Sequence, residues 1–342
     1  PHPPTPPLHP PTTAPRPPAH NALPLTGPIT LPIQTQYKET EKNNILDHAE
    51  ATIAMLSSTQ LSNFNNGFPS CVKHFVVLEN MQVYPVSELK KVQKAEAPEI
   101  SKIDAGVPEK TPSFPESDKD DLAAIIYTSG TTGRSKGVML SHDNLIFDAV
   151  QTGTIHQVVP EDVFLSVLQL AHTFEQTIGM IIPLMNGASV VYIDRPPVAS
   201  YLGPVLKKYR PTTMLTVPLI MEKIYRVRIK PGIEKSPVTR IMSRFGPTRK
   251  IVHKAAGKKL MDYFGGRMRF FGIGGAPLAP DVEKFLIEAK FPYAIGYGLT
   301  ETAPMLSGFA PDEPVYRSVG TVMEGVDIKI LNPDSETGEG EI

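Results

Sequence analysis

Hydrophobic and polar positions alternate in short blocks along most of this chain. Runs rich in Val, Ile and Leu predict buried strands at 29–33, 74–78, 122–127, 163–168, 188–193 and 213–216. Apolar residues that recur every three or four positions predict helices at 42–54, 141–152, 174–185, 201–209 and 281–289. Short strands separated by helices are typical of an α/β fold, with parallel sheets flanked by helices.

Two segments depart from this pattern. Ten of the 36 prolines fall within the first 18 residues. Proline fixes φ and removes an amide donor, so residues 1–22 are predicted to form an extended Pro-rich tail. Residues 94–120 are rich in Lys, Glu, Pro, Ser and Asp without apolar periodicity, which predicts a surface linker.

Composition excludes several classes of protein. With 41% hydrophobic and 20% charged residues the chain is not disordered throughout, and 25 glycines cannot supply a collagen repeat. Cys71 is the only cysteine, so no disulfide framework can form. No uninterrupted apolar run is long enough to span a bilayer, and no secretory signal is visible. These features predict a cytoplasmic protein.

The densest polar motif follows the predicted strand 122–127 and reads YTSGTTGRSKG from Tyr127 to Gly137. Its glycines let the backbone turn with amides exposed, its hydroxyls donate hydrogen bonds and its lysine carries a positive charge, which together suit polyphosphate oxygens. The spacing is not that of a P-loop. The alternative is a polar surface turn. The candidate phosphate-binding residues are Thr128, Ser129, Gly130, Thr131, Thr132, Gly133 and Lys136.

A second motif covers 295–302. Gly296 and Gly298 flank Tyr297, whose aromatic face could stack on a planar base. Thr300 adds a hydroxyl, and Glu301 a carboxylate oxygen of the kind that binds Mg²⁺. Taken alone the motif is weak, because Gly-Tyr-Gly also occurs in plain loops.

A third motif, Gly274, Gly275 and Ala276, follows the apolar pair Phe270-Phe271 and precedes the predicted helix 281–289. One interpretation is an ordinary strand-to-helix turn. The other is a loop whose backbone approaches a ligand closely.

These motifs, in this order, resemble the adenylate-forming (AMP-binding) enzymes, and among them the long-chain fatty acyl-CoA synthetases. Segments 138–142, 170–175 and 318–321 extend the resemblance, and 170–175 and 217–225 look like the long-chain acyl branch. The resemblance runs from about Leu23 to Ile342. It implies that residues 23–342 are part of the AMP-binding N-terminal domain.

The resemblance implies a two-step reaction. A fatty acid carboxylate attacks the α-phosphate of ATP to give an acyl-adenylate, and the thiol of coenzyme A then displaces AMP. Lys136, Thr300, Glu301 and His172 would be catalytic, with Mg²⁺ on Glu301. Tyr297 would pack on adenine, and Gly274 to Ala276 would border adenine and the acyl group. A histidine satisfied inside the fold is the alternative for His172.

An apolar tunnel would select the acyl chain, since each buried methylene contributes about 0.8 kcal/mol. Candidates to line it lie between Phe174 and Met185 and near Val217. The alternative is that these residues are plain core.

The chain also departs from the family pattern. The family has an opening segment before the point that matches Leu23, and it ends with a ribose-binding aspartate and a small C-terminal domain that carries a lysine. By resemblance the chain is truncated at both ends, and we expect its activity to be impaired. Two alternatives remain open: an acyl-AMP ligase that does not use coenzyme A, and a non-catalytic nucleotide- or acyl-binding protein.

Charge is distributed unevenly. The net charge is −1, yet residues 222–269 contain 14 Lys and Arg against three acids. This stretch is either a solvated helix face or a region attracted to an anionic ligand such as coenzyme A or to a membrane surface, as in a peripheral membrane protein. No helix-turn-helix, zinc or aromatic-stacking signature accompanies it, so no specific nucleic-acid partner is expected.

Overall fold

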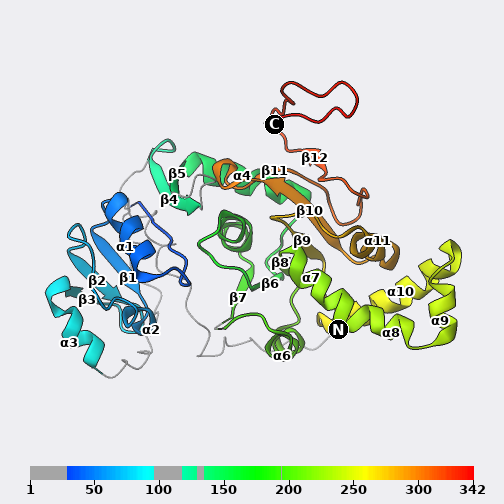
Figure 1. The fold of residues 1–342 in the computed structure, drawn as a ribbon, viewed down its shortest axis with the longest axis horizontal. Coiled ribbons are helices and arrows are strands. Elements are labelled where there is room, and N and C mark those ends of the chain that lie inside the picture. Colours follow the sequence, from blue (N-terminus) through cyan, green and yellow to red (C-terminus); the bar gives the residue numbers. More distant parts are fainter. Residues whose placement is uncertain (1–28, 96–117, 129–134, 194) are drawn as a thin grey trace, which may run out of the picture. The chain divides into compact units, whose positions relative to one another are not determined.

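The structure, a computed structural model, describes residues 29–95, 118–128, 135–193 and 195–342 (Figure 1). These residues form two compact units. Unit 1 comprises the chain up to Asp143 together with Gln169–Ala171, and unit 2 comprises Asn144–Leu168 and His172–Ile342. The tail at 1–22 and most of the linker at 94–120 lie outside the described residues. The single partial domain over 23–342 stays a prediction.

Unit 1 contains a three-stranded sheet in the order β1-β2-β3, with β1 and β2 parallel and β2 and β3 antiparallel. Phe75 of β2 is fully buried and packs with Leu61, Phe64 and Phe68. Its elements are α1 (Glu39–His48), β1 (Ile53–Leu56), α2 (Ser58–Leu61), β2 (His74–Val77), β3 (Gln82–Pro85), η3 (Val86–Glu88) and α3 (Leu89–Lys94).

Two predictions for this part of the chain were wrong. The helix expected at 42–54 ends at His48, because Glu50 adopts a left-handed φ of 51° and the Ala51 amide donates to the Leu46 carbonyl, a C-terminal cap. Residues 53–56 form strand β1 instead. The strand expected at 29–33 is reduced to a single parallel bridge between Thr30 and Ala124.

A second sheet in unit 1 is the hairpin of β4 (Leu122–Thr128) and β5 (Lys136–Ser141), which pair antiparallel. The sequence predicted strand, glycine loop and helix in this order. The structure places β5 between the loop and helix α4 (His142–Ile155), so the predicted phosphate loop joins two strands of a hairpin. A pairing partner in β4 supplies the hydrogen bonds that make this segment extended rather than looped.

Unit 2 is built on a seven-stranded sheet in the order β12-β11-β10-β9-β8-β6-β7. The five strands from β10 to β7 are parallel, and β11 and β12 add antiparallel pairs at one edge. This confirms the α/β fold with a parallel sheet and helices beside it (Figure 1). The strands are β6 (Val163–Ser166), β7 (Ser189–Tyr192), β8 (Thr213–Thr216), β9 (Phe270–Ile273), β10 (Tyr293–Gly298), β11 (Met305–Gly308) and β12 (Thr321–Val322).

Helices connect these strands, and the predicted helices at 174–185, 201–209 and 281–289 are confirmed. The first is a π-helical segment followed by an α-helical turn. The connecting helices are η4 (Phe174–Ile181), α5 (Ile182–Met185), α6 (Ala199–Tyr209), α7 (Pro218–Ile224), η5 (Tyr225–Ile229), α8 (Lys230–Glu234), α9 (Pro237–Met242), α10 (Gly246–Tyr263), α11 (Pro280–Ala289) and the short η6 (Thr300–Thr302).

The core of unit 2 lies between the sheet and helices α10 and α11. Met221, Leu260, Phe264 and Phe285 are completely buried there. Within the described residues no helix has the length and apolar character that crossing a bilayer requires.

Candidate functional site

Four neighbouring parallel strands of unit 2 end beside segments that the sequence singled out. β6 leads toward His172, β8 is followed by Val217, β9 by Gly274 to Ala276, and β10 ends in Gly296 to Gly298. Because β10, β9, β8 and β6 are adjacent and parallel, their carboxyl ends meet at one edge of the sheet. This edge is where ligands bind in open α/β sheets.

The loop after β9 is fixed at both ends. The Gly274 amide donates to the Thr216 carbonyl at 3.2 Å, and the Ala279 amide donates to the Glu222 carboxylate at 3.0 Å. A Cβ on Gly274 would lie 3.0 Å from the Phe174 ring, so glycine lets this ring pack tightly against the loop. Gly275, with φ of +87°, and Ala276 are exposed between these anchors. Their backbone is therefore accessible at the sheet edge.

The two glycines beside Tyr297 lie in close contacts that the sequence did not reveal. A Cβ on Gly298 would overlap the Pro304 backbone, and one on Gly296 would overlap the Met305 side chain. Gly296 and Gly298 lie in strand β10 rather than in a loop. The close approach of the Pro304 backbone requires glycine at 298, whereas the contact at 296 is with the end of the flexible Met305 side chain. Tyr297 is half-buried between them.

The three polar side chains of the short helix after β10, Thr300 to Thr302, differ in their hydrogen bonds. Thr302 is used by the turn, because its hydroxyl accepts from the Leu299 amide at 2.9 Å and donates to the Pro304 carbonyl at 2.8 Å. Neither Thr300 nor the exposed Glu301 has a hydrogen-bond or ion-pair partner among the described side chains.

Glu301 fits a magnesium ion that is bound together with a nucleotide. Mg²⁺ is usually held by one or two carboxylates together with substrate phosphates and waters. No cluster of three His, Cys, Asp or Glu side chains suited to a metal occurs in the described parts of the chain. A single exposed carboxylate therefore suits Mg²⁺ that arrives with phosphate oxygens, and not a metal centre made of protein alone.

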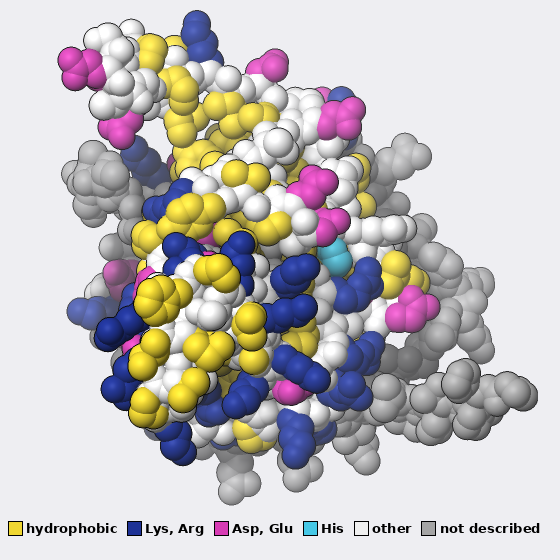
Figure 2. Space-filling view, turned by 90° about the vertical axis from the view of Figure 1, so that its right-hand side faces the viewer, with side chains coloured by type: hydrophobic (Ala, Val, Ile, Leu, Met, Phe, Trp, Pro, Cys, Tyr) yellow, Lys and Arg dark blue, Asp and Glu magenta, His cyan; other side chains and the backbone are white. Residues whose placement is uncertain are grey.

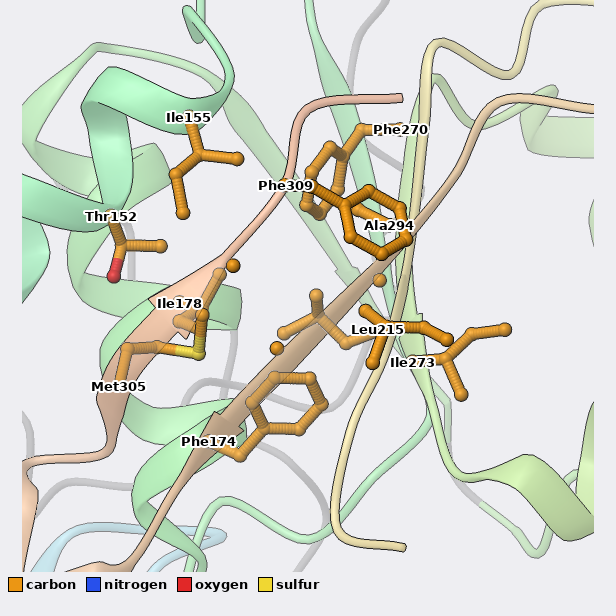
Figure 3. Close-up of a pocket in the computed structure, with 14 residues that line it drawn as sticks. Thr152, Ile155, Phe174, Ile178, Leu215, Phe270, Ile273, Ala294, Met305 and Phe309 are labelled. Carbon is orange, nitrogen blue, oxygen red and sulfur yellow. The ribbon is translucent and has the colours of Figure 1, made fainter. Parts of the chain in front are cut away.

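An apolar pocket lies within unit 2 beside β10 (Figure 3). Its volume of about 20 Å³ is room for one water molecule. Phe174 and Ile178 of η4 and Met305 of β11 project into it, and Thr152 is its one side chain with a polar group. The other lining residues are Ile155, Leu215, Phe270, Gly272, Ile273, Ala294, Ile295, Gly296, Gly308 and Phe309.

Only part of the segments predicted to line an acyl tunnel lies at this pocket. Phe174 and Ile178 line the pocket, whereas Met185 is exposed and Val217 is not among the lining residues. His172 is exposed at the start of η4, and its carbonyl accepts from the Gln176 amide at 2.9 Å. Burial of part of its imidazole lowers the pKa of His172 below its usual 6.5, so the ring is neutral at pH 7.

Sequence reasoning missed a buried acid in α4. Asp148 is 3% exposed and accepts from the Met305 amide at 2.8 Å, which ties α4 to the start of β11. Burial raises the pKa of Asp148 to about 7, although the Met305 hydrogen bond opposes the shift. The signal was present, since Leu145, Asp148, Ala149 and Thr152 share one helical face and all are buried.

A second missed acid is Glu175, which is 1% exposed inside η4. Burial raises the pKa of Glu175 to about 8, and a hydrogen bond from Ser166 only partly offsets this. A Cβ on Gly179 would lie 2.7 Å from the Glu175 carboxyl oxygen. The sequence signal for this buried acid is the glycine one helical turn later, because Gly179 leaves the space that the Glu175 carboxyl group fills.

The phosphate motif belongs to unit 1. Thr128 and Lys136 face each other as the last pair of the β4–β5 hairpin, with Thr128 half-buried and Lys136 exposed. The Tyr127 hydroxyl lies 2.5 Å from His48 Nδ1, and this contact anchors the hairpin to α1. The predicted phosphate ligands between this pair, which are Ser129, Gly130, Thr131, Thr132 and Gly133, lie outside the described residues.

Curated proteins with similar sequences are long-chain acyl-CoA synthetases. Long chain acyl-CoA synthetase 7, peroxisomal, of Arabidopsis thaliana is 31% identical over 235 residues, 62% of this chain and 32% of that protein. Long-chain-fatty-acid–CoA ligase heimdall of Drosophila melanogaster is 29% identical over 247 residues, 65% of this chain and 36% of that protein. Long chain acyl-CoA synthetase 5 of Arabidopsis thaliana is 27% identical over 342 residues, 87% of this chain and 49% of that protein. The chain spans between a third and a half of the length of these relatives.

Solved structures share the fold. MatB from Rhodopseudomonas palustris in its apo form has a TM-score of 0.63 at 23% identity, covering 92% of this chain and 53% of its own. The o-succinylbenzoate coenzyme A synthetase MenE from Bacillus subtilis, solved with ATP and magnesium, has a TM-score of 0.63 at 18% identity, covering 95% and 55%. A family model described as AMP-binding enzyme matches residues 13–342. The chain therefore belongs to the family of AMP-binding enzymes.

Proposed function

We propose that this chain carries nucleotide- and acyl-binding elements of an enzyme that joins a long-chain fatty acid to coenzyme A at the expense of ATP. The observation that carries the proposal is the edge of the unit 2 sheet, where four motif segments follow adjacent parallel strands beside an apolar pocket. The similarity to long-chain acyl-CoA synthetases supports the choice of a fatty acid over other carboxylic acids.

In the proposed first step, a carboxylate oxygen of the fatty acid bonds to the α-phosphorus of ATP and pyrophosphate leaves. In the second step, the thiol sulfur of coenzyme A bonds to the acyl carbon, AMP leaves and the thiol proton passes to solvent. Such displacements need positioning and charge neutralisation more than a protein nucleophile. Mg²⁺ would supply part of that neutralisation.

We assign roles residue by residue. Tyr297 stacks on adenine, while the exposed backbone of Gly274 to Ala276 borders the base and the acyl group. Thr300, with its unused hydroxyl, donates to the α-phosphate, and Glu301 holds Mg²⁺. Lys136 and the hydroxyls and amides at 128–133 bind phosphate oxygens. His172, neutral at pH 7, donates or accepts one hydrogen bond beside the fatty acid carboxylate.

The acyl chain is assigned to the pocket lined by Phe174, Ile178 and Met305. Its lining is almost entirely hydrocarbon, which suits an alkyl chain. At about 20 Å³ it is smaller than such a chain. Binding would therefore require the side chains of Phe174 and Met305 to turn away. Methionine does this readily because its side chain is unbranched and flexible.

Stable mimics of acyl-adenylates test this proposal by binding alone. The chain is titrated with palmitoyl and acetyl sulfamoyladenosine, which share the nucleotide and differ in the alkyl chain. We expect the palmitoyl compound to bind at least tenfold more tightly, since each buried methylene adds about 0.8 kcal/mol. Phe174→Ala should change this ratio, and Met185→Ala, at an exposed position outside the pocket, should not. Equal affinity of the folded chain for both compounds would contradict the acyl assignment.

A thioester assay separates this activity from that of an acyl-AMP ligase. Protein carrying these residues is incubated with ATP, Mg²⁺, palmitate and coenzyme A, and palmitoyl-CoA and the hydroxylamine-trapped adenylate are quantified together. The proposal predicts palmitoyl-CoA among the products of any preparation that makes the adenylate. Adenylate without thioester would support the ligase that does not use coenzyme A.

A further inference from the structure

Helix α9, helix α10 and the turn between them present apolar and basic side chains on one exposed face of unit 2. We call this the basic helical face and define it by Val238, Ile241, Phe245 and Ile251 together with Arg240, Arg244, Lys250, Lys254 and Lys258. The four apolar side chains are between 57% and 63% exposed. Figure 2 shows hydrophobic and basic side chains interspersed at this end of unit 2, with few acidic ones.

Packing fixes which side of α10 faces outward. Val252, His253, Gly257 and Leu260 are buried, and a Cβ on Gly257 would lie 2.7 Å from Ala289 of α11. The opposite side of the helix therefore points away from the core. Pro247, Ile251, Lys254 and Lys258 follow one another there at helical spacing, and Lys250 lies beside them.

Ion pairing distinguishes this face from the side of α10 that packs on α11. Arg249 of α10 pairs with Glu288 of α11 at 2.8 Å, and Arg226 of η5 pairs with Asp281 of α11 at 3.3 Å. Among the described residues, none of the five cations of the basic helical face makes an ion pair, and Arg240 alone of them donates to a neighbouring carbonyl, that of Glu234, at 2.8 Å. Their charge is thus available to an anionic partner.

We propose that the basic helical face binds the surface of an anionic lipid bilayer. Phe245, Ile241 and Val238 enter the boundary between headgroups and acyl chains, while the surrounding Lys and Arg contact lipid phosphates. Segments bind such an interface when exposed apolar side chains enter the headgroup boundary and neighbouring cations attract anionic lipids. Phosphate binding alone, as in nucleic acid recognition, gives no role to the apolar side chains. The proposal stands independently of the proposed enzymatic function.

Vesicle sedimentation tests the electrostatic part. The full chain is mixed with phosphatidylcholine vesicles that contain or lack phosphatidylserine. We expect at least tenfold tighter binding to the anionic vesicles, and at least a tenfold loss for Lys250→Glu/Lys254→Glu. The matched control Lys90→Glu/Lys91→Glu makes the same charge change on α3 of unit 1 and should bind within twofold of the parent. No binding of the folded chain to anionic vesicles, or an equal loss in the control, would overturn the proposal.

Insertion has its own test. The chain contains no tryptophan, so Phe245→Trp introduces a single fluorophore at the face and Val83→Trp introduces one at an exposed site of unit 1. With anionic vesicles we expect a blue shift and quenching by brominated lipid at position 245 and neither at position 83. Bound protein without this shift would contradict insertion. If the chain self-associates without lipid and Ile241→Ser/Phe245→Ser abolishes this association, the partner of the face is a second copy of the chain and the bilayer proposal is wrong.

Discussion

Thr300, Glu301 and Thr302 are consecutive residues with different tasks. The hydroxyl of Thr302 is hydrogen-bonded within the turn, whereas the side chains of Thr300 and Glu301 make no hydrogen bond or ion pair with the rest of the described chain. Groups that the fold does not use can be changed without loss of stability. Substitutions of Thr300 and Glu301 can therefore change ligand affinity without changing the stability of the fold.

Glu301→Gln should weaken the binding of Mg-ATP at least tenfold and leave AMP binding within twofold. The carboxylate charge is lost while the exposed side chain keeps its shape, so the midpoint of urea unfolding should not move. Calorimetry with each nucleotide measures this. Glu313→Gln is the control at another exposed acid of unit 2. An equal loss of affinity for Mg-ATP and AMP would argue against a metal role for Glu301.

Tyr297→Ala should weaken AMP binding by about 1–3 kcal/mol, the usual loss when an aromatic side chain no longer stacks on a base. Tyr297→Phe keeps the ring and should bind AMP within twofold of the parent. Fluorescence competition with a labelled AMP measures both variants. If both lose the same affinity, the hydroxyl rather than the ring face matters, and adenine stacking on Tyr297 is wrong.

Glu175 should make stability depend on pH. Its pKa is about 8 in the folded chain against a usual 4.5, so the folded state holds a proton that the unfolded state releases across this window. The free energy of unfolding should therefore fall as pH rises from about 5 to 8. Relative to Glu175→Gln, the parent should lose about 1.4 kcal/mol per pH unit. Urea unfolding of both proteins at four pH values isolates this contribution, and parallel curves would contradict it.

At the scale of elements, the contact between β10 and β11 is closer than any side chain would allow. The Gly298 Cα lies against the Pro304 backbone, and Asp148 of α4 holds the first amide of β11. The end of β10 that carries Tyr297 is thus positioned by a neighbouring strand and a helix.

Gly298→Ala should destabilise unit 2 by about 1–3 kcal/mol, because a new methyl group in a packed site forces backbone shifts. Gly153→Ala is the matched control in helix α4, where a Cβ meets nothing within 4 Å. It should stabilise by about 0.5–1 kcal/mol through helix propensity. Chemical denaturation measures both. Two shifts of the same sign would contradict the close-packing account of β10.

The sequence predicted strands β6, β7 and β8 of unit 2 and its helices α4, η4 with α5, α6 and α11, because these are short apolar runs and amphipathic segments that alternate along the chain. It did not predict strands β9 to β12 or helices α7 to α10. It failed at 53–56 and 136–141, where four to six residues of mixed character become strands through pairing with β2 and β4. Such segments have no decisive local periodicity. Their structure depends on a partner elsewhere in the chain, which local patterns do not record.

The same limit applies to the candidate site. Motif residues such as Tyr297 and Glu301 could be found because they are consecutive in the sequence. The hydrogen bond between Asp148 and the Met305 amide joins residues 157 positions apart, and no local pattern pairs them. The burial of Glu175 likewise follows from how η4 packs, although Gly179 hinted at it.

At the scale of the whole molecule, the chain combines a net charge of −1 with a strongly basic region from 222 to 269. The structure places the carboxyl ends of the unit 2 strands and the basic helical face on different elements, so nucleotide binding and lipid binding use different residues. Charge reversal at Lys250 and Lys254 should therefore leave AMP affinity within twofold of the parent, as calorimetry can show. A large loss would mean that these lysines serve the nucleotide.

Membership of the AMP-binding enzyme family makes nucleotide recognition the central claim. Its most direct test is calorimetric titration of Mg-ATP into the 342-residue chain, with circular dichroism to establish that the protein is folded. We expect saturable binding at one site per chain, for which AMP competes and which Tyr297→Ala weakens. A folded chain that shows no saturable heat with Mg-ATP, or whose binding is the same in that variant, would contradict it.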